Sequence, residues 1–368
     1  MKILQVTTHF NVGGITNYIF NLSRELKNNN ADVIVATSGG DMVKPFESEG
    51  MRHIKIPLNT KFELHPCVLL SALVIAGIVR REEIDIIHAH SRVSQVASLI
   101  ASKLTGVPFV TTCHGYFKLR GRKLLDSWGV RVIAISDAVR DHLMRDLRVS
   151  ADRITMIYNG VDTTKFGKRY SEEEKAALKN KLGINTKYLI GSIGRLSGVK
   201  GHEHIINALR ELCNTRDDVS ALIIGDGEES GRLNSLARAL CVHDKIVFLS
   251  SVMDTRPYLA IMDVFVFPSI KEGLGIALLE ALASRSAAVA SRIGGIENII
   301  IDGINGCLVP VGNYKKIAES VEFLLDRDLL RQTMGNKGRQ VVEEKFSLSS
   351  MAKETLSLYQ SLTRRARS

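Results

Sequence analysis

The sequence predicts an α/β protein made of two doubly wound, Rossmann-like domains, whose parallel sheets face each other across a cleft. Three observations support this prediction. The chain has 368 residues, which is enough for two domains of ordinary size. Short apolar runs alternate with longer amphipathic segments from end to end, as in successive βαβ units. These apolar runs number about ten, and they fit two sheets better than one.

The elements follow the same alternation in both halves of the chain. In the first half, strands are expected at residues 2–7, 32–37, 84–88, 109–112 and 132–135. Helical patterns lie between them, at residues 15–28, 66–81 and 94–105. In the second half, strands are expected at residues 188–193, 220–224, 246–248, 264–267 and 287–291. The chain turns polar and charged after residues 159–162, which predicts domains at 1–162 and 163–347, followed by a C-terminal segment at 348–368.

Composition and charge narrow the class of protein. The hydrophobic fraction of 45% and the charged fraction of 24% are ordinary for a globular chain and exclude a fibrous or mostly disordered one. The net charge of +10 predicts an anionic partner, which could be a phosphorylated ligand, an acidic membrane or nucleic acid. Five scattered cysteines without a CxxC pair favour a reducing cytoplasm over a disulfide or zinc framework. We find no signal-peptide pattern, and the longest apolar run, residues 67–79, is too short to cross a membrane.

Loops at the carboxyl ends of parallel strands are the candidate sites, because open α/β sheets bind ligands there. Gly13 and Gly14 separate the first strand from a helix, where they either let the backbone approach an anion or simply make a tight turn. Arg195 and Lys200 follow the strand at 188–193, with no acidic residue near them in the sequence. A guanidinium and an ammonium on such a loop suit a diphosphate, and solvated loop cations are the alternative.

The most informative loop follows the strand at 264–267. It contains Glu272 and reaches a helix near Gly275, with Glu280 about a turn and a half into that helix. A carboxylate accepts hydrogen bonds at two oxygens, which suits the paired hydroxyls of a sugar or a ribose. The helix start between the two glutamates can hold phosphate on its free N–H groups. The spacing of the glutamates is weak evidence on its own, and the strand–loop–helix setting strengthens it.

Other patterns have plainer interpretations. The 326–328 segment imitates a metal-binding DxD motif, but a solvated helix end explains it better. The histidine pairs at 88/90 and 202/204 lack a third ligand of suitable spacing, so polar strand-end or helix-start residues are favoured over a metal site. The chain has no P-loop and an incomplete dinucleotide fingerprint. Nucleic-acid motifs and interleaved aromatic residues are also missing, which argues against RNA or DNA.

Several blocks of the sequence, in order, resemble glycosyltransferase family 4, the retaining GT-B enzymes that use nucleotide-sugar donors. The resemblance covers nearly the whole chain and is most specific where the Arg195/Lys200 loop is combined with the paired glutamates. The blocks are Gly13-Gly14, Asp85-Ile86-Ile87-His88-Ala89-His90, Thr112-Cys113-His114-Gly115, Ala134-Ile135-Ser136, Asn159-Gly160-Val161-Asp162, Gly194-Arg195-Leu196 with Lys200-Gly201, Gly225-Asp226-Gly227-Glu228, and Glu272-Gly273-Leu274-Gly275 with Glu280.

The resemblance implies a metal-independent hexosyltransferase that needs no cofactor beyond its nucleotide-sugar co-substrate. The first domain would bind a glycan or lipid-linked acceptor and the second the donor, with the C-terminal helix crossing back to the first domain. His114 would lie near the reacting sugar and the acceptor hydroxyl. The donor site would comprise Gly13, Gly14, Arg195, Lys200, Glu272, Gly273, Leu274, Gly275 and Glu280.

Roles within that site also follow from the resemblance. Arg195 and Lys200 would neutralise the diphosphate leaving group. Glu272 would bind hydroxyls of the hexose, and Glu280 those of the ribose. Transfer would retain the anomeric configuration by a same-face path, so no glutamate nucleophile is expected. Two departures from the family pattern occur: Glu228 replaces a proline, which should touch no proposed contact, and Leu274 replaces a phenylalanine.

The first domain is the more basic one, with 20 Lys and Arg against 14 Asp and Glu in residues 1–160. Four of these cations form a loop cluster after His114 that either meets an anionic acceptor or membrane, or is merely solvated: Lys118, Arg120, Arg122 and Lys123. The bacterial character of the sequence and this basic domain favour cell-envelope or lipopolysaccharide synthesis at the inner face of the plasma membrane, by a monomer or weak oligomer. Rival hypotheses are a nucleotide-sugar epimerase of the same fold and a non-catalytic glycan- or nucleotide-binding protein.

Overall fold

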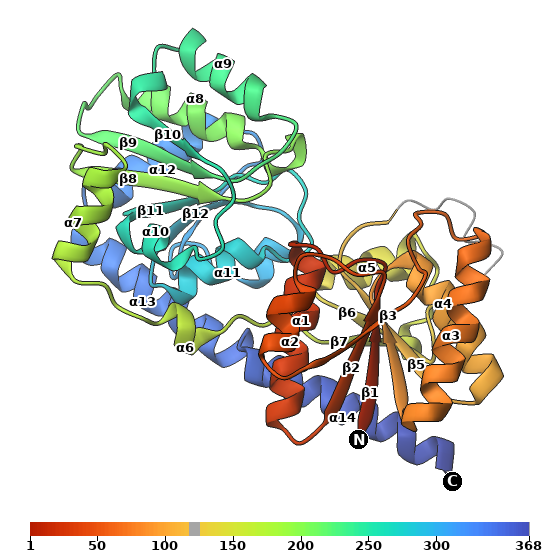
Figure 1. Cartoon of the computed structure of the whole chain (residues 1–368). Helices are drawn as coiled ribbons and strands as arrows, with labels where there is room; N and C mark the ends of the chain where they lie inside the picture. Colours follow the sequence, from red (N-terminus) through yellow and green to blue (C-terminus); the bar gives the residue numbers. More distant parts are fainter. Residues whose placement is uncertain (118–125, 368) are drawn as a thin grey trace. The chain divides into compact units, whose positions relative to one another are not determined.

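The protein consists of two α/β units, each built on its own parallel sheet (Figure 1). The computed structural model describes residues 1–117 and 126–367. Unit 1 contains Met1–Gly160 and Leu348–Ser368, and unit 2 contains Val161–Ser347. The predicted class of two doubly wound, parallel-sheet domains is confirmed.

Unit 1 has a seven-stranded sheet in the order β3-β2-β1-β4-β5-β6-β7, with all neighbours parallel. Its strands are β1 (Lys2–Val6), β2 (Asp32–Thr37), β3 (Arg52–Lys55), β4 (Ile86–Ala89), β5 (Phe109–Cys113), β6 (Arg131–Ala134) and β7 (Ile154–Met156). Its helices are α1 (Gly14–Asn28), α2 (Val43–Ser48), α3 (Pro66–Glu82), α4 (Arg92–Thr105), α5 (Asp137–Arg145) and α14 (Leu348–Arg367). The sequence did not predict the short strands β3 and β7, which lie at the two edges of this sheet.

Alternating side chains of the unit 1 strands build two cores, one on each face of the sheet. Ile3 packs with α1, α2 and α14, whereas Leu4 packs with α3 and α4. The C-terminal helix α14 therefore belongs to unit 1, where Met351 and Tyr359 are buried against α1 and the sheet.

Unit 2 has a six-stranded parallel sheet in the order β10-β9-β8-β11-β12-β13. Its strands are β8 (Tyr188–Ile193), β9 (Val219–Ile224), β10 (Ile246–Leu249), β11 (Val264–Phe267), β12 (Ala287–Ser291) and β13 (Cys307–Val309). Its helices are α6 (Thr163–Phe166), α7 (Glu172–Lys181), α8 (His202–Leu212), α9 (Ser230–Ala239), α10 (Arg256–Ile261), α11 (Ile276–Ala283), α12 (Tyr314–Leu325) and α13 (Asp328–Lys345). The edge strand β13 was also missed by the sequence analysis.

The strand order reverses between β1 and β4 in unit 1, and between β8 and β11 in unit 2. Such a switch point leaves a crevice at the carboxyl ends of the strands, because the connections on its two sides run in opposite directions. The loops after β8 and β11 carry Arg195, Lys200 and Glu272, so the topology of unit 2 brings these residues to one place.

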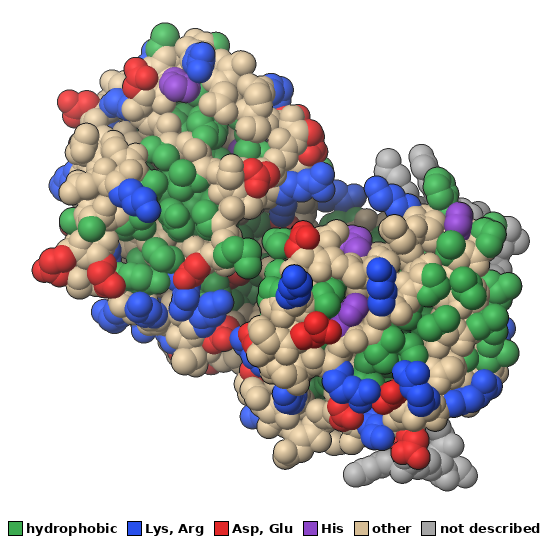
Figure 2. Space-filling model, in the orientation of Figure 1, with side chains coloured by type: hydrophobic (Ala, Val, Ile, Leu, Met, Phe, Trp, Pro, Cys, Tyr) green, Lys and Arg blue, Asp and Glu red, His purple; other side chains and the backbone are tan. Residues whose placement is uncertain are grey.

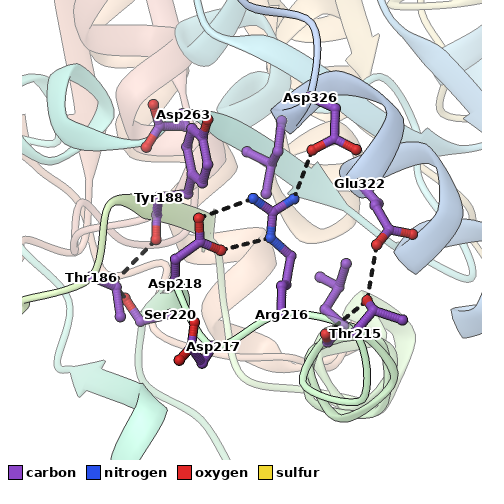
Figure 3. A network of polar contacts seen from close by, with 12 residues as sticks. Thr186, Tyr188, Thr215, Arg216, Asp217, Asp218, Ser220, Asp263, Glu322 and Asp326 are labelled. Carbon is purple, nitrogen blue, oxygen red and sulfur yellow. Dashed lines mark hydrogen bonds and ion pairs between the residues drawn. The ribbon is translucent and has the colours of Figure 1, made fainter.

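Part of the opposite end of the unit 2 sheet is covered by a polar network around Arg216 (Figure 3). The Arg216 guanidinium donates to both oxygens of Asp218, at 2.7 and 3.1 Å, and to Asp326 at 3.1 Å. Asp328 pairs with Arg331 at 2.8 Å. Both acids of the DxD look-alike are thus paired with arginines at a helix end. In the described ranges, no group of three His, Cys, Asp or Glu side chains could hold a metal ion.

Candidate functional site

Two loops at the carboxyl end of the unit 2 sheet, those after β8 and β9, are joined by backbone hydrogen bonds. Gly194 N–H donates to Ile224 at 3.0 Å, and Leu196 N–H donates to Asp226 at 2.8 Å. A Cβ atom on Gly225 would lie 1.9 Å from the Gly194 carbonyl oxygen, so only glycine permits this approach. Close packing of the β8 and β9 loops therefore explains the Gly225-Asp226-Gly227 motif.

Lys200 and Glu272 form an ion pair across the switch point of unit 2. The two side chains are 25% and 15% exposed, so water screens them only in part. The other oxygen of Glu272 accepts the Gly273 N–H at 3.2 Å, and the Lys200 ammonium lies 5.6 Å from the centre of the Phe267 ring. The site residues expected to contact diphosphate and hexose are therefore in direct contact with each other.

Arg195 also has an acidic partner, Glu228, at 3.4 Å. Both side chains are mostly exposed, so this ion pair contributes little to stability. The expectation that Glu228 touches no proposed contact is wrong, because the close packing of the β8 and β9 loops places it beside Arg195. The local sequence around Arg195 could not show this partner, which lies on the next strand's loop.

Glu280 lies on α11, which begins directly after Gly275. Its Oε2 accepts the Thr255 hydroxyl at 3.4 Å, and burial raises the pKa of this carboxyl from its usual 4.5 to about 7. Gly275 has φ +98°, and a Cβ atom there would lie 3.1 Å from the Phe267 ring. Leu274 is buried, so the loop is anchored in the core while Glu272 and Glu280 stay partly accessible.

In unit 1, Gly13 and Gly14 form the N-terminus of α1, as predicted. Nothing lies within 4 Å of a Cβ atom built on Gly14, and the nearest atom to one on Gly13 is 3.9 Å away. Gly13 has φ 167°, an extended conformation open to any residue. Neither backbone conformation nor packing within the protein therefore requires glycine at these two positions.

His114 follows β5 and is half-buried, next to a group of buried polar side chains at the carboxyl ends of β1, β4 and β5. Its Nε2 lies 3.1 Å from Nδ1 of His90, and Nε2 of His90 lies 2.6 Å from Oε1 of Gln5. The Tyr18 ring packs edge-on against the His114 ring, with 4.8 Å between their centres. Burial lowers the pKa of His114 to about 3 and that of His90 well below 6.5, so both rings are neutral at pH 7.

These contacts fix the tautomers of the two rings. Oε1 of Gln5 can only accept, so His90 carries its proton on Nε2. Nδ1 of His90 must then accept, which puts the His114 proton on Nε2. His114 consequently keeps an unprotonated Nδ1, a nitrogen able to accept a hydrogen bond from a hydroxyl group.

A neighbouring histidine ties this group to the end of the chain. Nδ1 of His88 lies 2.5 Å from the Tyr359 hydroxyl on α14, and Nε2 of His88 lies 2.7 Å from the Thr112 hydroxyl. The nitrogens of the 88/90 pair are thus engaged with protein groups. Sequence analysis predicted His114 but missed Gln5 and Tyr359. Gln5 is a polar residue in an otherwise apolar strand, which is a usable signal, whereas the amphipathic sequence of α14 does not single out Tyr359.

The remaining candidates are the histidine pair at 202/204 and the basic cluster after His114. Burial lowers the pKa of His202 to about 4, and contacts with the backbone of Arg195 and Gly194 oppose this shift. Nε2 of His204 lies 3.9 Å from a carboxylate oxygen of Glu203. The basic cluster Lys118, Arg120, Arg122 and Lys123 lies outside the described residues.

Comparisons with known proteins identify the family of the chain. The "Glycosyltransferase Family 4" model matches residues 12–165, and the "Glycosyl transferases group 1" model matches residues 174–341. Alpha-maltose-1-phosphate synthase of Mycolicibacterium smegmatis is 30% identical over 77% of this chain and 80% of its own. The capsular polysaccharide biosynthesis glycosyltransferase CapM of Staphylococcus aureus is 26% identical over 91% of each chain.

A solved structure shows the same fold. HepE of Anabaena, in complex with UDP-glucose, superposes with a TM-score of 0.85 at 22% identity, covering 98% of this chain and 100% of its own. The two family matches and the M. smegmatis relative confirm the resemblance found in the motifs, and the superposition confirms the fold. The chain belongs to the group 1 glycosyltransferases, enzymes of the family 4 type with the GT-B fold.

Proposed function

We propose that this glycosyltransferase moves a hexose from a nucleoside-diphosphate sugar to a glycan or lipid-linked acceptor, with retention of configuration. The observation that carries the proposal is the Lys200–Glu272 ion pair at the switch point of unit 2, with Glu280 on the helix that follows. This arrangement offers positive charge for a diphosphate beside carboxylates for sugar hydroxyls. The complex of HepE with UDP-glucose supports a nucleotide-sugar donor.

The charges in unit 2 suit the leaving group. When the glycosidic bond breaks, negative charge grows on the terminal phosphate oxygen, and Arg195 and Lys200 stabilise it. Lys200 is held by Glu272 before the donor arrives, so its ammonium needs little rearrangement to meet the phosphate. Glu272 then accepts hydroxyls of the hexose and Glu280 those of the ribose. The two cations supply the charge, so the proposed reaction needs no bound metal.

Unit 1 provides His114 for the acceptor side and the turn at Gly13 and Gly14 for the donor. His114 presents an unprotonated Nδ1 that can accept a hydrogen bond from a hydroxyl of a bound sugar or acceptor. The open space beside Gly13 and Gly14 leaves room for a ligand at the N-terminus of α1, where backbone N–H groups favour an anion. The acceptor hydroxyl attacks on the face from which the diphosphate leaves, so no carboxylate acts as a nucleophile.

We propose that the acceptor is lipid-linked and that the enzyme acts at the cytoplasmic face of an anionic membrane. An exposed apolar surface of unit 1 supports this proposal. Hydrophobic side chains gather over α3 (Figure 2), and we call the exposed set Phe62, Leu64, Leu69, Leu70 and Leu73 the α3 patch. Leu64 is 92% exposed and Phe62 75%. Contiguous apolar surface of this kind is typical of membrane or protein contacts. No described helix is long and apolar enough to span a bilayer. The name of CapM supports a pathway in envelope polysaccharide synthesis.

A panel of UDP-, GDP-, ADP- and dTDP-sugars tests the proposal by thermal shift, followed by turnover with and without acceptor. We expect one class of donor to raise Tm, and release of its nucleoside diphosphate to require an acceptor. An epimerised sugar formed without acceptor would instead identify an epimerase. Failure of every nucleotide sugar to bind would contradict the proposed donor site.

A further inference from the structure

Unit 2 has a cavity of about 510 Å³ at the end of its sheet opposite the candidate site. The cavity lies where β11 and β12 begin, between the segment before α7, the C-terminal end of α11 and the middle of α13. Its volume is in the range of small-molecule sites. Two carboxylates line the cavity, Glu172 and Asp263. They are outnumbered by five cations: Lys168, Arg169, Lys175, Arg285 and Arg331.

The two carboxylates do not balance this charge, because each already has a cationic partner. Glu172 pairs with Lys175 at 2.8 Å, and Asp263 lies 3.6 Å from Arg331. Within the part of the chain that the structure describes, neither Arg169 nor Arg285 forms an ion pair with a carboxylate. Glu343 attracts Arg285 from a longer distance and already pairs with Arg339. The cavity therefore has two guanidinium groups with no carboxylate at ion-pair distance among the described residues.

Arg285 has an unusual backbone conformation as well as a charge that no carboxylate pairs directly. It follows α11 with φ +64°, in the left-handed position that glycine usually fills after a helix. Ser286 N–H closes the turn on Ala281 at 3.0 Å, and Nη1 of Arg285 donates to the Gly167 carbonyl at 3.3 Å. Desolvation, together with the charges of Arg339 and Arg169, lowers the pKa of Arg285. A side chain that is costly in both respects points to a ligand rather than to a structural role.

We propose that this cavity binds a small phosphorylated molecule, whose phosphate is held by Arg169 and Arg285. The planar guanidinium group suits bidentate binding of phosphate oxygens, and an anion would offset the repulsion between the two arginines. Gln332 and Asn336 add amide groups from α13 for the rest of the ligand. The site is separate from the proposed donor site, since it lies at the other end of α11 from Gly275.

Hydrogen–deuterium exchange with inorganic pyrophosphate as the probe tests this site and locates it independently of donor binding. Pyrophosphate is expected to slow exchange at least twofold in segments 165–175 and 284–287. Arg285→Gly should abolish this protection while keeping or raising Tm, because glycine suits φ +64°. Cys241→Gly is the matched control: Cys241 follows α9 with φ +55°, so its replacement should relieve similar strain and keep the protection.

Arg169→Gln is a second variant that leaves the α11 turn untouched, and it should also lose the protection. Unprotected segments in the wild-type protein, or undiminished protection in both arginine variants, would overturn the proposal. The same exchange experiment is repeated with phosphatidylcholine vesicles that contain phosphatidic acid, in place of pyrophosphate. Protection of the same segments by these vesicles but not by pyrophosphate would reject a small soluble ligand in favour of a lipid headgroup.

Discussion

Nδ1 of His90 and Nε2 of His114 lie 3.1 Å apart, within hydrogen-bond distance, in a half-buried part of unit 1. Because Gln5 fixes the proton of His90 on Nε2, the tautomer of His114 is set two hydrogen bonds away from the ring itself. Gln5 and His90 are thus positioning residues for the group proposed to meet the substrate.

Gln5→Leu removes the acceptor that fixes this order of protons. We expect kcat for transfer to fall about tenfold, as for other residues that orient an active histidine, with little change in KM for the donor. Steady-state kinetics measure kcat and KM separately, and ¹⁵N NMR of the imidazoles reports the tautomer of His114. A protein with unchanged kcat and an altered His114 tautomer would show that the tautomer is irrelevant to transfer.

Glu272→Ala tests the proposed hexose contact. We expect kcat to fall at least a hundredfold, whereas binding of the free nucleoside diphosphate is largely spared because Arg195 and Lys200 remain. Glu228→Ala is the matched control, because it also removes the acidic partner of a site cation. Its exposed pair with Arg195 contributes about 0–1 kcal/mol, so transfer should change less than threefold. Equal losses in both variants would contradict the assignment.

Glu280 should make stability depend on pH. Its pKa of about 7 in the folded protein lies above the usual 4.5 of a glutamate, so the folded state binds this proton more tightly than the unfolded state does. The stabilisation is complete below pH 4.5 and is lost as pH rises through 7. Its upper limit is about 3 kcal/mol, and partial exposure reduces it. We expect the Tm of Glu280→Gln, measured by calorimetry, to rise relative to that of the wild type as the pH increases from 4.5 to 8. A constant difference in Tm over this range would rule out the raised pKa.

Gly275→Ala and Gly14→Ala should have opposite phenotypes. Alanine at 275 must adopt φ +98° against Phe267, so we expect a loss of about 1–3 kcal/mol in stability. Alanine at 14 meets no protein atom within 4 Å, so Tm should stay unchanged. If the donor approaches the Gly14 backbone as proposed, its KM will nevertheless rise. Wild-type kinetics in Gly14→Ala would remove α1 from the donor site.

The α3 patch should govern attachment to membranes. Replacing Leu69 and Leu73 with Ser removes two apolar side chains that are 57% and 54% exposed, and should weaken binding to phosphatidylglycerol vesicles about tenfold. Flotation assays measure the bound fraction. The double variant Met253→Ser/Leu329→Ser removes exposed apolar surface from unit 2 and should float as the wild type does. The membrane proposal fails if the two double variants behave alike.

The sequence predicted the sheets and the loops of the site because their signals are local. Apolar runs marked the central strands, and the glycines around Glu272 marked the turn into α11. Edge strands such as β3 (Arg52–Lys55) escaped because they are short and only half-buried, so they lack a continuous apolar run. Partners brought together by the fold also escaped, since Lys200 meets Glu272 across 72 residues and His88 meets Tyr359 across 271.

The return of the chain to unit 1 has a consequence for biosynthesis. Unit 2 is one continuous segment, whereas the core of unit 1 lacks Met351, Leu358 and Tyr359 until the last residues are made. On the ribosome, unit 2 can therefore complete its core while the α1 side of the first sheet is still uncovered. The half of the enzyme that is translated first is the half that finishes folding last.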